Sequence, residues 1–75
     1  MKSQHEIRSL VRQHRVTMGM TQQELAERVG VTRQTILAIE KGNYTPSVAL
    51  ALGLASVLGV TVEALFQIDA GGRDG

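Results

Sequence analysis

Residues 22–41 have the sequence QQELAERVGVTRQTILAIEK, which predicts two short helices joined by a tight turn. Thr21 is placed to cap the first helix, and Glu24 three residues later completes a T-x-x-E capping box. Gly30 follows this helix, where glycine adopts a positive φ and ends the helix without steric cost. Thr32 is a second N-cap, so both helices have a defined start.

The second of these helices has an apolar side and a polar side. Ile36 and Ile39 form an apolar stripe, and the small Ala26 allows the first helix to pack closely against the second. The opposite face carries Arg33 and Gln34 near the start of the helix. The same face also holds Leu37 and Ala38, with Thr35 and Lys41 at its margins. Arg and Gln at this end of an exposed helix read base edges in a major groove, so the pattern predicts a helix–turn–helix that binds double-stranded DNA.

A helical hairpin inside an ordinary bundle is the alternative interpretation of the same residues. Ala26, Gly30 and Ile36 have the spacing of a helix–turn–helix, and the second helix keeps an unburied polar face. This combination favours DNA binding over a structural hairpin.

Apolar periodicity along the rest of the chain predicts an all-α domain of five helices. The first helix is expected to begin within Glu6–Ser9 and to end near Met18, because apolar residues recur at helical spacing. The residues on this face are Ile7, Leu10, Val11, His14 and Met18, of which all but His14 are apolar. The other helices are expected over residues 22–29, 33–41, 48–58 and 62–66. Phe66–Ile68 alternates in polarity and predicts a short strand.

The chain has 75 residues, no cysteine and a formal net charge of +1. We expect one domain over residues 1–68 and a flexible Gly- and Asp-rich tail over residues 69–75. The N-terminus lacks the apolar region of a signal peptide, which favours a cytoplasmic protein. The longest apolar stretch, Val48–Val60, is too short to span a bilayer, so no membrane association is expected.

The charges are distributed unevenly along the chain. Residues 1–45 hold seven basic and four acidic side chains, whereas residues 46–75 hold one basic and three acidic side chains. The basic part coincides with the predicted helix–turn–helix, so it would orient the protein on a phosphate backbone.

The expected helix over residues 48–58 has almost no polar face. A helix that is apolar all round needs cover on every side, and five short helices cannot enclose one of their number. Gly53 and Ser56 are small enough for another backbone to approach. We therefore expect a self-association surface on this helix and the one that follows, because monomers rarely expose broad apolar patches.

The segment over residues 20–66 resembles the Cro/cI-type (XRE) helix–turn–helix regulators of bacteria and their phages. Residues 32–66, TRQTILAIEKGNYTPSVALALGLASVLGVTVEALF, are especially similar to the short regulators typified by the cytolysin repressor. The resemblance implies a five-helix lambda-repressor-like fold and a homodimer on a pseudo-palindromic operator, with no cofactor. Strands that flank the helices help to join the dimer in such relatives, a role that Phe66–Ile68 would fill.

The resemblance also implies which residues touch DNA. Positions that read bases in the family correspond to Arg33, Gln34, Leu37 and Ala38. Leu37 and Ala38 depart from the polar residues common there, so they offer only apolar contact, for example to a thymine methyl. Readout would then depend on Arg33 and Gln34 and on DNA shape. Phosphate contacts are implied for Thr21, Gln22, Thr32, Thr35, Lys41, Asn43 and Tyr44.

Two further groups of residues are assigned structural roles. Arg15 and Glu40 match a pair that is ion-paired in many family members and would join the first and third helices. The expected dimer interface takes the apolar residues of the C-terminal elements, namely Leu52, Val57, Val62, Phe66 and Ile68.

A protein-interaction module is the alternative function, because antitoxins use the same fold and a partner protein would cover the apolar helix 48–58. An enzyme is disfavoured, since the sequence has no cysteine, no supported Ser/His/Asp arrangement and no phosphate-binding loop. We therefore predict no catalytic, cofactor-binding or metal-binding residues. His14 is interpreted as a partly buried packing residue, because His5 is nine residues away and no acidic cluster adjoins it.

Overall fold

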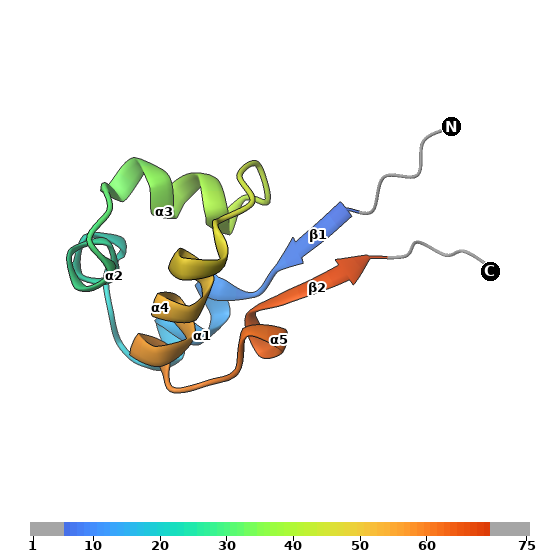
Figure 1. Ribbon diagram of the computed structural model, residues 1–75. Helices are drawn as coiled ribbons and strands as arrows, with labels where there is room; N and C mark the ends of the chain where they lie inside the picture. Colours follow the sequence, from blue (N-terminus) through green and yellow to red (C-terminus); the bar gives the residue numbers. More distant parts are fainter. Residues whose placement is uncertain (1–5, 70–75) are drawn as a thin grey trace.

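The computed structural model describes residues 6–69, and side-chain caps define the starts of four of its five helices. The elements in chain order are β1 (Glu6–Ser9), α1 (Val11–Thr17), α2 (Gln22–Val29), α3 (Arg33–Glu40), α4 (Val48–Leu58), α5 (Val62–Leu65) and β2 (Phe66–Asp69). The predicted all-α five-helix fold is confirmed, with a small two-stranded sheet added to it. The helices form one body, and the sheet projects from it (Figure 1).

The predicted helix starts are confirmed for α2 to α5, because each is set by a neighbouring side chain. Thr21 and Glu24 form the complete capping box, with the Glu24 amide donating to the Thr21 hydroxyl at 3.0 Å. Three further N-cap hydroxyls accept a hydrogen bond from the third residue of the following helix. These caps are Thr32, Ser47 and Thr61. Such bonds satisfy backbone amides that a helix start leaves without a partner.

The predicted start of the first helix is wrong. Residues 6–9 form β1, which pairs antiparallel with β2 so that Ile7 lies opposite Ile68. The Leu10 amide then donates to the Leu65 carbonyl at 2.7 Å, and α1 begins only at Val11. Pairing with a distant strand satisfies the backbone of residues 6–9, and this outweighs their helical spacing. At the other end Met18 is the C-cap and is 52% exposed, so it does not belong to the core.

Smaller corrections apply to three other predicted boundaries. Helix α3 ends at Glu40 rather than Lys41, and α5 ends at Leu65 because Phe66 begins β2. The strand continues to Asp69, so the predicted tail does not begin at that residue. The remainder of the predicted tail, residues 70–75, lies outside the described residues.

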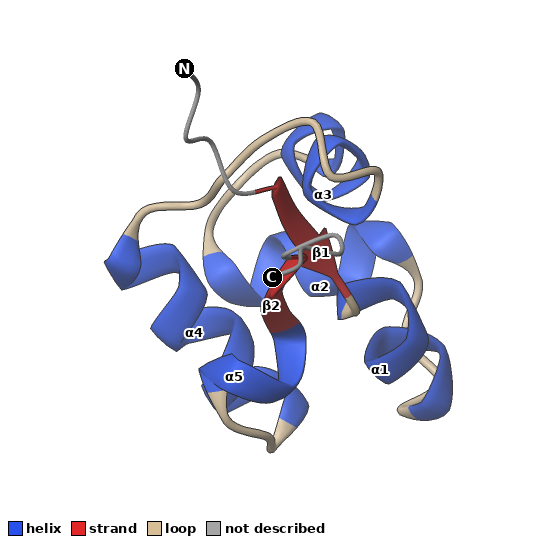
Figure 2. Ribbon diagram, turned by 90° about the vertical axis from the view of Figure 1, so that its right-hand side faces the viewer, coloured by secondary structure: helices blue, strands red, loops and turns tan. Residues whose placement is uncertain are grey.

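The core lies between the helices, and every element from α1 to α5 contributes to it. Its fully buried large side chains are Val11, Leu25, Ile36, Ile39, Leu54 and Leu65. Seen along the sheet, α4 and α1 lie on opposite sides of it, with α3 above (Figure 2). No helix within residues 6–69 has the length and apolar character needed to cross a membrane.

Candidate nucleic-acid interface

Helices α2 and α3 pack as the sequence predicts, with a tight turn between them. Gly30 ends α2 at a φ of 77°, a left-handed conformation that glycine adopts without strain. The Val31 amide donates to the Ala26 carbonyl at 3.0 Å, which closes the turn. Ala26 is fully buried where the two helices meet. The turn therefore places α3 on the surface, with the residues at its N-terminal end exposed to solvent.

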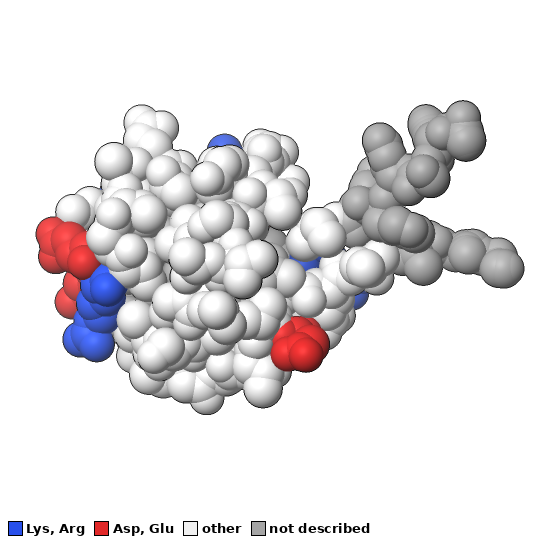
Figure 3. Space-filling view, viewed as in Figure 1, with Lys and Arg blue, Asp and Glu red and all other residues white. Residues whose placement is uncertain are grey.

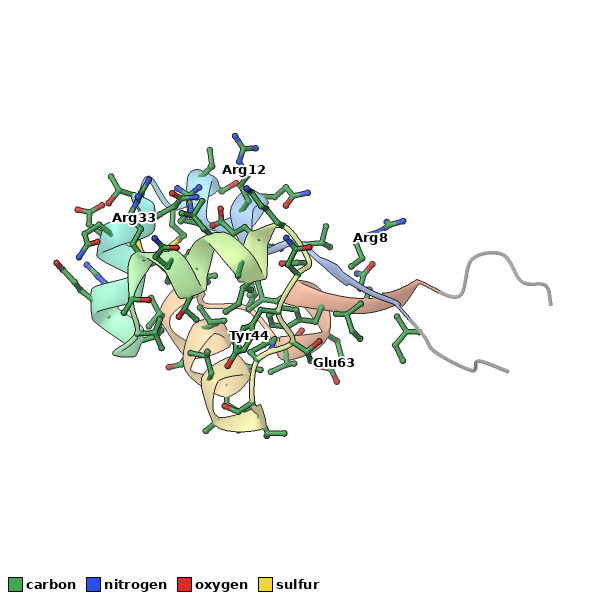
Figure 4. All side chains as sticks on the ribbon, turned by 90° about the horizontal axis from the view of Figure 1, so that it is seen from above. Arg8, Arg12, Arg33, Tyr44 and Glu63 are labelled. Carbon is green, nitrogen blue, oxygen red and sulfur yellow. The ribbon has the colours of Figure 1, made fainter. Side chains whose placement is uncertain are left out.

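Burial divides α3 into the two faces that the sequence indicates. Ile36 and Ile39 are fully buried, whereas Arg33 and Gln34 are exposed at the start of the helix. Leu37 and Ala38 are half-buried, so each shows only part of its side chain to solvent. In the view from above, Arg33 lies at the end of α3 that is next to α2 (Figure 4). Among the four base-reading candidates, Arg33 and Gln34 are therefore the most accessible.

The candidate phosphate ligands have different surroundings. Lys41, Asn43 and Tyr44 are exposed where α3 ends and the connection to α4 begins. The hydroxyls of Thr32 and Thr35 lie 3.1 Å apart at the start of α3, and Thr35 is half-buried. Thr21 is exposed, but its hydroxyl already accepts a bond within the capping box. The structure thus places these residues around both ends of α3 and at the start of α2.

A buried ion pair joins α1 to α3. Arg15 donates through Nε to Glu40 Oε2 at 2.6 Å and through Nη2 to Oε1 at 3.3 Å, and the two side chains are 10% and 4% exposed. The third guanidinium nitrogen, Nη1, donates to the Met20 carbonyl at 2.7 Å. Arg15 therefore fixes the end of α1, the loop after it and the last turn of α3 at once.

One contact in this cluster was not apparent from the sequence. Gln22, a candidate phosphate ligand, donates through its side-chain amide to Glu40 Oε1 at 3.1 Å. The two residues are separated by 18 positions, and neither has a local pattern that indicates the pairing. The contact positions the Gln22 amide at the start of α2, beside α3, while the side chain remains half-buried.

The charged side chains are not spread evenly over the surface. The face shown in Figure 3 is mostly uncharged. Acidic and basic side chains gather at its left end, and a separate acidic patch lies at its lower right. Helix α4 contributes exposed apolar side chains to the surface, with Val48 76% and Leu52 57% exposed. Residues 6–69 contain no group of His, Asp or Glu side chains arranged to hold a metal ion.

Comparison with known proteins agrees with this geometry. A helix–turn–helix family model matches residues 11–65. A helix–turn–helix-type transcriptional regulator of Methanothermobacter thermautotrophicus is 55% identical over 67 residues, covering 88% of this chain and 97% of the relative. The Bacillus subtilis regulator YgzD is 41% identical over 63 residues, covering 84% of this chain and 96% of the relative.

Solved structures show the same fold. The restriction-modification controller protein C.AhdI from Aeromonas hydrophila superimposes with a TM-score of 0.66 at 28% identity, covering 71% of this chain and 80% of that one. A chain of the SinR–SinI protein complex gives a TM-score of 0.67 at 31% identity, covering 72% of this chain and 53% of that one.

The fold and the exposed α3 define a DNA-binding helix–turn–helix protein rather than an enzyme. Within that class the chain belongs to the Cro/cI-type (XRE) family of transcriptional regulators. The family resemblance of residues 20–66 is thereby confirmed.

Proposed function

We propose that this protein is a homodimeric repressor that recognises a pseudo-palindromic operator in the cytoplasm. The observation that carries the proposal is the division of α3, in which Ile36 and Ile39 are buried while Arg33 and Gln34 are exposed at its start. Two copies would present α3 to successive major grooves, about 34 Å apart on one face of the duplex. The bound dimer would repress by blocking access of the polymerase to the promoter.

Base recognition in this proposal depends mainly on Arg33 and Gln34. An arginine binds guanine through two hydrogen bonds, and glutamine binds adenine in the same way. Leu37 and Ala38 are half-buried and apolar, so they offer contact to thymine methyl groups. The exposed residues at the end of α3 would hold phosphates and set the register of the helix.

The dimer would form through the apolar residues of the C-terminal elements. Ile68 on β2 and Leu52 on α4 are 62% and 57% exposed. The other candidates, Val57, Val62 and Phe66, are partly buried against the core. An isolated chain of this size has a small core, so covering Ile68 with a second copy would add buried apolar area.

The most direct test is selection of bound sequences from random duplexes at two salt concentrations. We expect a two-fold symmetric consensus that persists at the higher concentration, because base contacts in both half-sites contribute to binding. A flat profile with steep salt dependence would reduce the activity to nonspecific phosphate attraction and refute the proposal.

Replacing Arg33 with alanine is expected to weaken operator binding by about 1–3 kcal/mol and to relax the preference at one base pair in each half-site. The reason is the removal of a two-bond interaction with a guanine. The measurement is a Kd for the selected operator and for its single-base variants. An Arg33→Ala protein that binds as tightly and as selectively as the wild type would rule out this assignment.

Replacing Lys41 with alanine is expected to weaken binding to all duplexes alike. Lys41 is exposed after the last residue of α3, where a phosphate contact carries no sequence information. The slope of log K against log salt should become less steep by about 0.9 for each phosphate that is no longer neutralised. A change in the selected consensus would instead indicate that Lys41 reads bases.

Protein binding is the second candidate function, and the exposed side of α4 favours it. Val48 and Leu52 project from a helix without a charged residue, and a different protein could cover them in place of a second copy. The SinR–SinI structure is an example of a related fold in a complex with another protein. The mass of the purified chain in solution distinguishes self-association from binding of a different protein. Self-association predicts a stable dimer, and a missing partner predicts a monomer.

A further inference from the structure

Two arginines outside the helix–turn–helix share a side of the molecule with Arg33. Arg8 lies on β1 and Arg12 lies in the first turn of α1, and both are exposed. In the view from above, the labelled Arg8, Arg12 and Arg33 extend from the same edge of the molecule, whereas Tyr44 and Glu63 lie toward the other edge (Figure 4). The candidate base-reading side of α3 therefore continues into a basic surface, Arg8 and Arg12, contributed by β1 and α1.

Strand β1 is held beside the C-terminal end of α3. Gly42 follows Lys41 in the connection from α3 to α4, and its φ of 79° is the left-handed conformation. A Cβ placed on Gly42 would lie only 3.8 Å from the Ile7 carbonyl oxygen. Since Arg8 is the next residue of the strand, it begins close to the end of the candidate recognition helix. Arg8 therefore adds a positive charge near that end of α3, where Lys41 is also exposed.

Neither Arg8 nor Arg12 forms a salt bridge with any side chain that the structure describes. The salt bridge recorded among the described residues joins Arg15 to Glu40, and it is buried. Arg8 is opposite Gln67 in the sheet, whereas Glu6 and Asp69 form the outermost backbone pair, farther from the helices. Arg8 and Arg12 are both exposed, so an anionic ligand can reach their guanidinium groups.

The alternation of β1 and β2 separates apolar from polar residues. Ile7 and Ile68 are one opposed pair, and Arg8 and Gln67 are the next pair along the ladder. Successive side chains of a strand point to opposite faces, so Arg8 faces away from the side that Ile68 occupies. One face of the projecting sheet can meet a second copy while the other presents Arg8. Glu6 and Asp69 share the Arg8 face by register, farther from the helices.

We propose that Arg8 and Arg12 bind DNA phosphates at the centre of the operator, between the two half-sites. This inference rests on the proposed function. In a dimer joined through Ile68, the projecting sheets lie between the two copies of α3. Arg8 would then face the backbone of the central base pairs, and Arg12 would bind the phosphates next to it. Such interactions neutralise phosphates and release counterions without reading sequence.

The test compares the full-length wild type with the double variant Arg8→Gln/Arg12→Gln on the operator selected from random duplexes. The variant dimer would leave four phosphates without an arginine, so the slope of log K against log salt should fall in magnitude by about 3–4. Hydroxyl-radical protection of the central backbone should disappear, while protection in the half-sites and the selected consensus remain. Thermal melts followed by circular dichroism establish that both proteins are folded.

Two matched variants complete the experiment. Arg28→Gln removes one positive charge per subunit, half as many as the double variant, from the last turn of α2, at the far end of that helix from Gln22. It should keep the central protection. Arg8→Lys/Arg12→Lys keeps both charges and should restore the salt slope. A double glutamine variant with the salt slope of Arg28→Gln and intact central protection would overturn this inference while leaving the proposed function in place. A wild type that selects no symmetric operator would overturn both.

Discussion

Replacing Arg15 with methionine is expected to lower the free energy of unfolding by about 3–5 kcal/mol, because the change leaves a buried carboxylate without its cation. Glu40 is 4% exposed in its side chain, and Arg15 supplies two of the hydrogen bonds to it. The amide of Gln22 would remain as a neutral donor. Domains of this size are stable by only about 5–15 kcal/mol, so urea denaturation at neutral pH should show a much lower midpoint.

The double variant Arg15→Met/Glu40→Leu is the matched control. It removes both charges and replaces them with apolar side chains, an exchange that is often neutral or stabilising for a buried pair. We expect it to recover most of the stability that the single variant loses. A double variant as unstable as Arg15→Met would contradict the explanation, since an unpaired buried charge would then not be the cause.

Replacing Ile68 with aspartate is expected to convert the proposed dimer into a monomer and to weaken operator binding by about 100- to 10,000-fold. Ile68 is 62% exposed on β2, so the change costs little inside one subunit, but it places a charge in the proposed interface. Binding of the second half-site would no longer be intramolecular, which removes the gain from bivalency. Sedimentation equilibrium gives the mass, and titration of the selected operator gives the affinity.

Two other aspartate variants make this result specific. Met18 is exposed to a similar extent, 52%, at the C-cap of α1. We expect the Met18→Asp protein to keep the mass of a dimer and the operator affinity of the wild type. Leu52→Asp tests whether α4 contributes to the same interface. If the Ile68→Asp protein is still a dimer and binds the operator with full affinity, β2 is not part of the proposed interface.

Much of the helical fold was predictable because its determinants are local. The N-caps Thr21, Thr32, Ser47 and Thr61 each bind an amide three residues away, so the sequence alone indicates where α2 to α5 begin. Gly30 ends α2 for an equally local reason, its positive φ. The exposed Arg33 and Gln34 followed from the same logic, since burial of Ile36 and Ile39 leaves the start of α3 facing solvent.

Contacts between distant residues decided what the sequence did not indicate. Residues 6–9 have helical spacing, yet they form β1 because residues 66–69 offer a paired backbone. The bond from Gln22 to Glu40 and the position of β1 beside Gly42 also depend on how whole elements pack. Caps and turns act over three or four residues, so the chain itself determines the helices and the turn between α2 and α3. Strand pairing and the continuation of the basic surface join residues far apart in sequence, and only the tertiary structure brings those residues together.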